Sequence, residues 1–199
     1  MKRYFVFGFI ILFIYSAYQI IFQSPKVWPE GVIVAESPIQ VDLSALSKNL
    51  ILYKGATLEP LADYQIKARI LSRETYWLGA FSQISPLDLA LGWQEMSDSK
   101  NLKYMKITQA DRFYFYQYQY SISLSTEQMM RTSANVHIIP SQSTLEKRLN
   151  NLKVGQIITL KGQLVKAHLK DGSEYVSSLS REDTGPGACE ILYVTELVD

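Results

Sequence analysis

Two side chains of this sequence have the chemistry needed for nucleophilic catalysis. Cys189 is the only cysteine of the chain, and His137 is one of its two histidines. A thiol that an imidazole activates, with Asn135 or Asp183 orienting the ring, would make a cysteine-dependent hydrolase. Against this, no signature of a cysteine-hydrolase family surrounds Cys189, and the residue begins a strand pattern instead of a helix. We therefore favour a packing role for the cysteine and keep the hydrolase as the alternative.

A polar loop with the sequence SSLSREDTGPGACE, at 177–190, contains the cysteine. Two glycines and a proline within it indicate a tight, irregular turn. Its arginine and aspartate can pair with each other, and polar residues of the segment 133–140 can hydrogen-bond to the loop. We interpret this cluster as a structural network, with a ligand or partner site on the same loop as the alternative. Its candidate residues are Asn135, His137, Arg181, Asp183 and Thr184.

The sequence offers little to a metal ion or a cofactor. His137 and His168 have neither an i,i+4 nor an H-x-H spacing, and one cysteine cannot build a cysteine-rich site. The acidic residues Glu182, Asp183 and Glu190 match no calcium-loop spacing. We predict no metal site and no cofactor.

An aromatic segment at 111–120 has four tyrosines at alternate positions. In a strand these tyrosines share one face, while two phenylalanines and two glutamines share the other. The pattern predicts a central strand with aromatic cross-strand pairs. An exposed aromatic platform for a sugar or a base is the alternative.

The patterns along the sequence predict that these residues are positioned by an α+β domain with mainly antiparallel strands. Capping patterns predict helices that begin at Ser85 and at Ser143. We also expect a third, shorter helix at 125–132. Asp171 and Gly172 predict a hairpin turn. Apolar alternation predicts strands at 31–41, 50–53, 64–71, 157–164, 175–180 and 191–197. The segment 153–162, KVGQIITLKG, resembles a pattern found in OB-like and SH3-like barrels, so a partly open barrel is an alternative.

The first residues of the chain predict a membrane anchor. Residues 4–22 carry no formal charge, and at roughly 1.5 Å per helical residue they match the ~30 Å hydrocarbon core of a bilayer. Lys2 and Arg3 precede this span, which favours a cytoplasmic amino terminus. We predict a cytoplasmic stub at 1–3, a transmembrane helix at 4–22 that contacts the lipid bilayer, a linker at 23–30 and one extracytoplasmic domain at 31–199. A cleaved signal peptide and a buried core helix are the alternatives.

Composition limits the partners of the domain. Without Lys2 and Arg3 the chain keeps 18 basic and 19 acidic residues, a net charge of −1, and it has no long charge run. We therefore predict no nucleic-acid binding. An oxidising compartment with a single thiol excludes an intrachain disulfide, so packing alone must hold the domain.

Three segments, 85–93, 133–140 and 177–190, resemble parts of a group of uncharacterised bacterial single-pass membrane proteins with a signal-anchor. The resemblance extends over most of the chain from about Trp77 onward. It supports the anchored topology and implies no activity. Together with the orientation that Lys2 and Arg3 favour, we expect a protein of the bacterial inner membrane with its amino terminus in the cytoplasm and its domain in the periplasm. We accordingly expect a binding module of the cell envelope, with an envelope protein as partner, and a hydrolase that uses Cys189 and His137 as the alternative.

Overall fold

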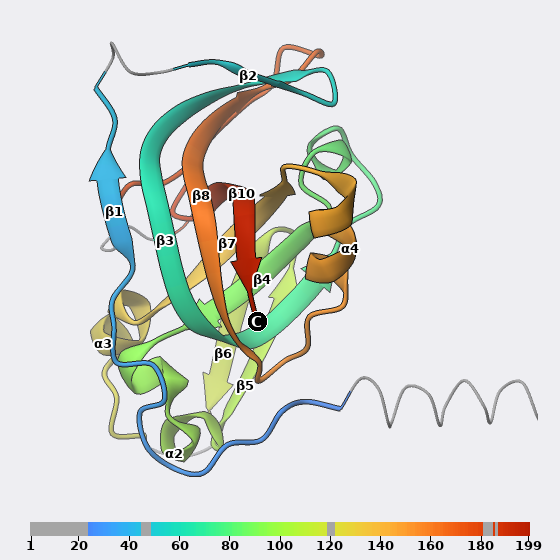
Figure 1. Cartoon of the computed structure of the whole chain (residues 1–199). Coiled ribbons are helices and arrows are strands. Elements are labelled where there is room, and N and C mark those ends of the chain that lie inside the picture. Colours follow the sequence, from blue (N-terminus) through green and yellow to red (C-terminus); the bar gives the residue numbers. More distant parts are fainter. Residues whose placement is uncertain (1–23, 45–48, 119–121, 181–184, 186) are drawn as a thin grey trace, which may run out of the picture.

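One long strand holds the fold together. β3 (Ala56–Thr75) has 20 residues, and its buried and less buried side chains alternate along most of its length, as expected when one face of a strand lies in a core. Residues up to Arg69 pair with β8 (Ile157–His168), and the rest pair with β4 (Leu87–Gly92). This computed structural model describes residues 24–44, 49–118, 122–180, 185 and 187–199. Figure 1 shows β3 and β8 as curved strands that run side by side.

The remaining strands close the sheet into a barrel. β7 (Ser133–Pro140) pairs antiparallel with β4 and parallel with β10 (Glu190–Val198), and β10 pairs antiparallel with β8. The ring order is thus β3-β4-β7-β10-β8 and back to β3. Between β7 and β8 the chain forms α4 (Ser143–Asn150). A five-stranded barrel of this connectivity is an OB-fold barrel, a type that binds ligands on its second and third strands and the adjoining loops.

Local irregularities allow the strands to curve around the barrel. The register shifts between Pro60 and Ala62 in β3, and again between Val194 and Glu196 in β10. Gly162 of β8 lies so close to β10 that an added Cβ would meet the carbonyl oxygen of Tyr193. Bulges and a glycine at a close backbone approach are the usual means of bending a sheet into a barrel.

Leucine, isoleucine and valine side chains from all five strands fill the barrel, and Leu145 and Leu149 of α4 join this core. Short elements surround it, and their order along the chain is β1 (Ile39–Asp42), β2 (Ile51–Tyr53), η2 (Phe81–Gln83), η3 (Gln94–Ser97), α2 (Ser99–Leu102), α3 (Thr126–Arg131) and β9 (Glu174–Val176). A separate hairpin of β5 (Met105–Ala110) and β6 (Phe113–Tyr118) joins β4 to β7. Its Ile107 and Tyr116 pack against a buried cluster that includes Leu71 of β3 and Ala90 of β4, so the hairpin covers part of the outer face of the barrel.

The predicted α+β class is wrong. Of the described residues, 47% are in strands and 15% in helices, so the domain is mostly β. The largest error is the helix predicted to begin at Ser85, where the structure has the strand β4. All six residues of β4 are buried, and a short apolar run that is buried on both faces has no period that separates a strand from a helix.

The other helix predictions have mixed outcomes. α3 follows Ser125, whose hydroxyl accepts a hydrogen bond from the backbone N–H of Gln128 in a capping box. α4 begins at Ser143, but its N-cap is Gln142 and no side chain caps it. The aromatic segment is a strand, β6, but it belongs to the two-stranded hairpin and is not central.

The predicted membrane span at 4–22 lies outside the described residues. Within the described part of the chain, no helix is long and apolar enough to cross a membrane. Residues 26 and 28, in the predicted linker, hydrogen-bond to the turn before β8, through Lys26 N to Val154 O and Trp28 Nε1 to Gly155 O.

Candidate functional site

Asp88 and His137 face each other on the outer surface of the barrel. Leu87, Leu89, Val136 and Ile138 lie in the barrel core. Because side chains alternate along a strand, Asp88 of β4 and His137 of β7 point to the opposite, outer face. The two residues are direct partners in the antiparallel register. In an OB-fold barrel this is the ligand-binding face.

Asp88 is fully buried and contacts two basic side chains. Its Oδ1 lies 2.8 Å from a guanidinium nitrogen of Arg112, and its Oδ2 lies 2.9 Å from Nδ1 of His137. The second contact has the distance of an ion pair but not the geometry of a hydrogen bond. A buried carboxylate needs such partners, because an isolated buried charge is strongly unfavourable.

The turn of the β5–β6 hairpin brings Arg112 to this aspartate. Asp111 and Arg112 have φ values of 51° and 70°, and two successive positive φ values are typical of a tight type I′ turn. The guanidinium also donates to Ser82 Oγ at 2.8 Å and stacks over the ring of Tyr76 at 3.8 Å. The hydroxyl of Tyr76 accepts a hydrogen bond from the backbone N–H of Arg112. Arg112 is thus fixed by the loop between β3 and β4.

His137 has an unusual electrostatic environment. Burial lowers the pKa of its imidazole, but Asp88 and the thiol of Cys189 raise it more strongly, and the pKa rises to about 9. The ring of Phe81 stands edge-on to the imidazole at 5.8 Å and stacks on Tyr175 at 4.2 Å. His137 is therefore a protonated, largely water-excluded imidazolium at neutral pH.

Cys189, the residue just before β10, lies at the same site. Its Sγ lies 3.7 Å from Nδ2 of Asn135, which donates, and 3.7 Å from the carbonyl oxygen of Arg112, which accepts. Asn135 is itself held in place, because Gln109 donates to its Oδ1 and its Nδ2 donates to the same carbonyl. β10 pairs parallel with β7, and Ile191 is the register partner of His137. This pairing brings Cys189 and His137 to the lining of the same pocket.

Two pockets meet at Cys189. The larger has a volume of about 330 Å³ and an aromatic wall that includes Phe113, Phe115 and Tyr116. The smaller, of about 260 Å³, has His137, Glu174 and Tyr175 among its lining residues. The thiol is half-buried between them, so a small molecule can approach it from two sides.

The structure brings together Cys189, His137 and Asn135, three of the predicted residues. The other three, Arg181, Asp183 and Thr184, lie outside the described residues. Sequence reasoning missed Asp88 and Arg112. The available signal was Asp88, a polar residue within an otherwise apolar strand. Its spacing from Ser85 matches a capping box, and this match favoured the helix predicted to begin at Ser85.

Among the described residues, no three His, Cys, Asp or Glu side chains are grouped as ligands for one metal ion. Burial raises the pKa of Tyr114, which lies in the wall of the larger pocket, to about 12, although a hydrogen bond with Ser133 opposes the shift. Its phenol is therefore a neutral hydrogen-bonding group. Comparisons with protein-family models, with curated proteins and with solved structures find no match for this chain.

Proposed function

We propose that the protein is a cysteine-dependent hydrolase of an acyl compound, with Cys189 as nucleophile. The observation that carries the proposal is the meeting of a thiol, an imidazole and a buried carboxylate at the mouth of two pockets. A nucleophile, a base in contact with it and a third group that orients the base are the recurring parts of such sites. Asp88 takes the orienting role that the sequence had given to Asn135 or Asp183.

The position of His137 supports a nucleophilic role for Cys189. The imidazole and the thiol line the same pocket, and a cysteine reacts as its thiolate, which a neighbouring imidazolium favours. The thiolate attacks the acyl carbon and forms a C–S bond. The bond from this carbon to the leaving atom then breaks as His137 gives its proton to that atom. The neutral imidazole then takes a proton from water as the water attacks the thioester. Cleavage of the C–S bond releases the acid and restores the ion pair.

The two pockets can hold the leaving group and the acyl group of the substrate separately. The leaving group must lie beside His137, and this places it in the smaller pocket. The acyl group then occupies the larger pocket, whose aromatic wall suits an apolar chain or ring. Nδ2 of Asn135, next to Sγ, is suitably placed to donate to the developing oxyanion.

The test uses the full chain in detergent micelles. We expect iodoacetamide to alkylate Cys189 rapidly at pH 6.5, and His137→Ala to slow the reaction about tenfold. With p-nitrophenyl esters of two to eight carbons, we expect a burst of one equivalent and an acyl adduct on Cys189. Cys189→Ala removes the adduct, and His168→Ala is the matched control that keeps it. Alkylation that is slow until the chain unfolds, with no adduct, would contradict the proposal.

A second candidate function is binding without chemistry, as a module of the cell envelope. It is favoured by the large apolar side chains of Trp77 and Leu78, which are 86% and 90% exposed in the loop between β3 and β4. That loop borders the ligand face of an OB-fold barrel. A partner that protects this loop from proteolysis while Cys189→Ala leaves its affinity unchanged would favour this function.

We propose in addition that residues 4–22 anchor the protein in the bacterial inner membrane, with the domain in the periplasm. The uncharged stretch after Lys2 and Arg3 supports this location. The protein should then resist carbonate extraction and become accessible to protease when the outer membrane is opened. A soluble product that begins near Tyr18 would contradict the anchor.

A further inference from the structure

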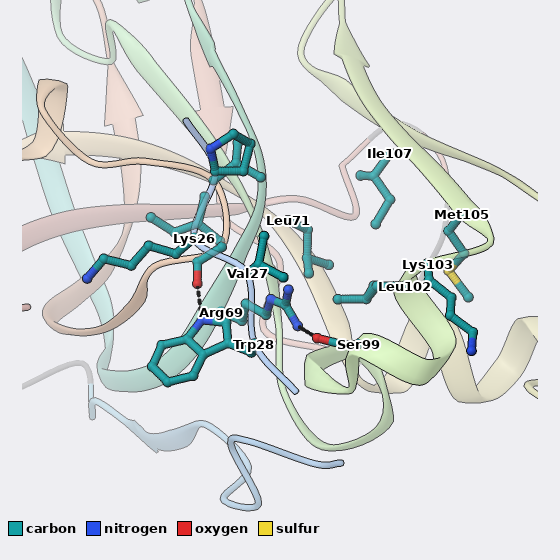
Figure 2. A pocket seen from close by; sticks show the side chains of 14 residues that line it. Lys26, Val27, Trp28, Arg69, Leu71, Ser99, Leu102, Lys103, Met105 and Ile107 are labelled. Atoms are coloured by element: carbon teal, nitrogen blue, oxygen red, sulfur yellow. Dashed lines mark hydrogen bonds between the residues drawn. The ribbon is translucent and has the colours of Figure 1, made fainter. Parts of the chain in front are cut away.

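A separate pocket lies on another side of the barrel, between residues 25–28 and β5 (Figure 2). Its volume is about 300 Å³, at the lower end of the range for ligand pockets. Its lining combines an apolar wall with basic side chains, and the described residues that form it include no Asp or Glu. The apolar wall comprises Val27, Ile70, Leu71, Leu102, Met105 and Ile107, and the basic residues are Lys26, Arg69 and Lys103.

Specific contacts hold one wall of this pocket in place. Lys26 N donates to Val154 O at 2.9 Å, and Trp28 Nε1 donates to Gly155 O at 2.6 Å. Gly155 has a φ of 83°, and a Cβ there would lie 2.0 Å from the carbonyl oxygen of Lys26. Only a glycine fits this close approach. The residues that follow the apolar amino-terminal stretch are therefore a fixed part of the domain surface.

Arg69 gives the pocket its charge. Arg69 is only 8% exposed, and its guanidinium donates to two neutral acceptors. These are Ser97 O at 3.0 Å and Ser99 Oγ at 2.8 Å, and Figure 2 shows the bond to Ser99. No carboxylate among the described residues forms an ion pair with it. Burial lowers the pKa of Arg69, and the more distant charge of Asp98 only partly opposes this. A buried guanidinium has five N–H donors and favours an anionic partner.

The position of the pocket along the chain identifies a source of such anions. Its first lining residue, Pro25, comes three residues after the uncharged stretch 4–22. At roughly 3.5 Å per extended residue, the pocket lies within ~10–20 Å of the membrane surface if that stretch spans the bilayer. Phospholipids at such a surface present an anionic head attached to an apolar chain.

We propose that this pocket binds one anionic phospholipid, with the phosphate of its head group at Arg69 and the start of an acyl chain against Leu71, Leu102 and Ile107. The lipid supplies the counter-charge that the protein does not place beside Arg69. Of the other two basic residues, Lys103 already pairs with Glu30 at 2.7 Å, so Arg69 is the main anion-binding group.

The experiment is native mass spectrometry of the full chain in a neutral detergent, titrated with phosphatidylglycerol and with phosphatidylcholine of the same acyl chains. We expect one phosphatidylglycerol to bind about tenfold more tightly than phosphatidylcholine. Arg69→Gln should reduce its affinity to that of phosphatidylcholine, and Arg69→Lys should retain part of the preference. Lys147→Gln, a change of an exposed cation on α4, is the matched control and should have no effect.

A second variant tests the apolar wall without touching Arg69. Ile107→Trp fills the pocket, so we expect both lipids to lose affinity while the far-ultraviolet circular dichroism keeps its native form. Equal affinity for the two lipids, or phosphatidylglycerol binding that survives both Arg69→Gln and Ile107→Trp, would overturn the proposal. Tighter binding of oleate than of phosphatidylglycerol would overturn the phospholipid assignment in favour of a free fatty acid.

Discussion

The two histidines of the chain have the same local geometry and different surroundings. His137 and His168 are each the register partner of an acidic residue on a neighbouring strand, and each has Nδ1 within 2.9 Å of that carboxylate. The Asp88–His137 pair lies in the barrel wall under a hairpin, with the Asp88 side chain fully buried. The His168–Glu174 pair lies on a β8–β9 edge hairpin, with the two side chains 36% and 50% exposed.

The difference shows that burial, rather than pairing, makes a candidate site. Water screens the exposed pair and competes for its hydrogen bonds, so such pairs contribute little to stability. The buried pair is screened much less, and each of its charges depends on the partners that the fold supplies. Arg112 and Phe81 complete the enclosure of the buried pair. Arg112 comes from the turn between β5 and β6, and Phe81 comes from the connection between β3 and β4.

The largest effect should come from removing the buried carboxylate. Asp88→Ala leaves Arg112 and His137 without their counter-charge, and we expect it to lower the free energy of unfolding by about 3–5 kcal/mol. Urea unfolding of the full chain in micelles, followed by tryptophan fluorescence, measures the change. A loss below about 1 kcal/mol would mean that water reaches Asp88, Arg112 and His137. The difference in burial between the two histidine pairs would then not have the effect that we infer.

The second prediction is that His137 makes the free energy of unfolding depend on pH. Its pKa is about 9 in the folded protein and 6.5 ordinarily, so the folded state binds the proton more tightly. The resulting stability is fully present below pH 6.5 and is lost as the pH rises to 9. The loss should be on the order of 3 kcal/mol.

Two variants separate the contribution of His137 to the pH dependence of stability from the contributions of other groups. His137→Gln should remove the decline between pH 6.5 and 9, whereas His168→Gln should keep it. A decline that persists unchanged in His137→Gln would assign the pH dependence to other groups.

Local patterns in the sequence predicted the local parts of this fold. The short helix predicted at 125–132 is α3, and the contacts that define it join residues three or four positions apart. The turn at Gly172, with a φ of 85° and an N–H that donates to Leu169 O, is equally local. The alternation of Ile66, Ala68 and Ile70 likewise shows directly which face of β3 is buried.

The candidate site could not be predicted in full, because it depends on contacts between distant segments. Asp88 meets His137 only through the β4–β7 register, and Cys189 reaches it through the parallel pairing of β7 with β10. Arg112 lies in a hairpin turn, and no pattern of charges in the sequence indicates that it pairs with Asp88. The sequence suggested His137 and Cys189 as one alternative from their types alone, and it assigned β4 to a helix.

A smaller effect should come from loosening Arg112 while its charge is kept. Tyr76→Phe removes the hydroxyl that accepts from the Arg112 backbone N–H and leaves the aromatic ring beneath the guanidinium. We expect a loss of about 0.5–1.5 kcal/mol in urea unfolding. Tyr104→Phe, at an exposed residue with a cation over its ring, is a comparison variant that should lose less. A loss as large as that of Asp88→Ala would show that the hydroxyl, rather than the carboxylate, fixes the arginine.

The smallest effect on stability should come from the exposed pair. Glu174 contacts His168 and Lys166, each at 2.8 Å, and because its side chain is half exposed Glu174→Gln should change the free energy of unfolding by less than about 1 kcal/mol. The same carboxylate lines the smaller pocket with Cys189, so it should still act on molecules that enter there. Negative charge at the pocket mouth repels iodoacetate but not neutral iodoacetamide. We therefore expect Glu174→Gln to raise the rate of alkylation by iodoacetate, relative to that by iodoacetamide, about twofold, which corresponds to ~0.4 kcal/mol. An unchanged ratio would mean that reagents reach the thiol through the larger, aromatic pocket instead.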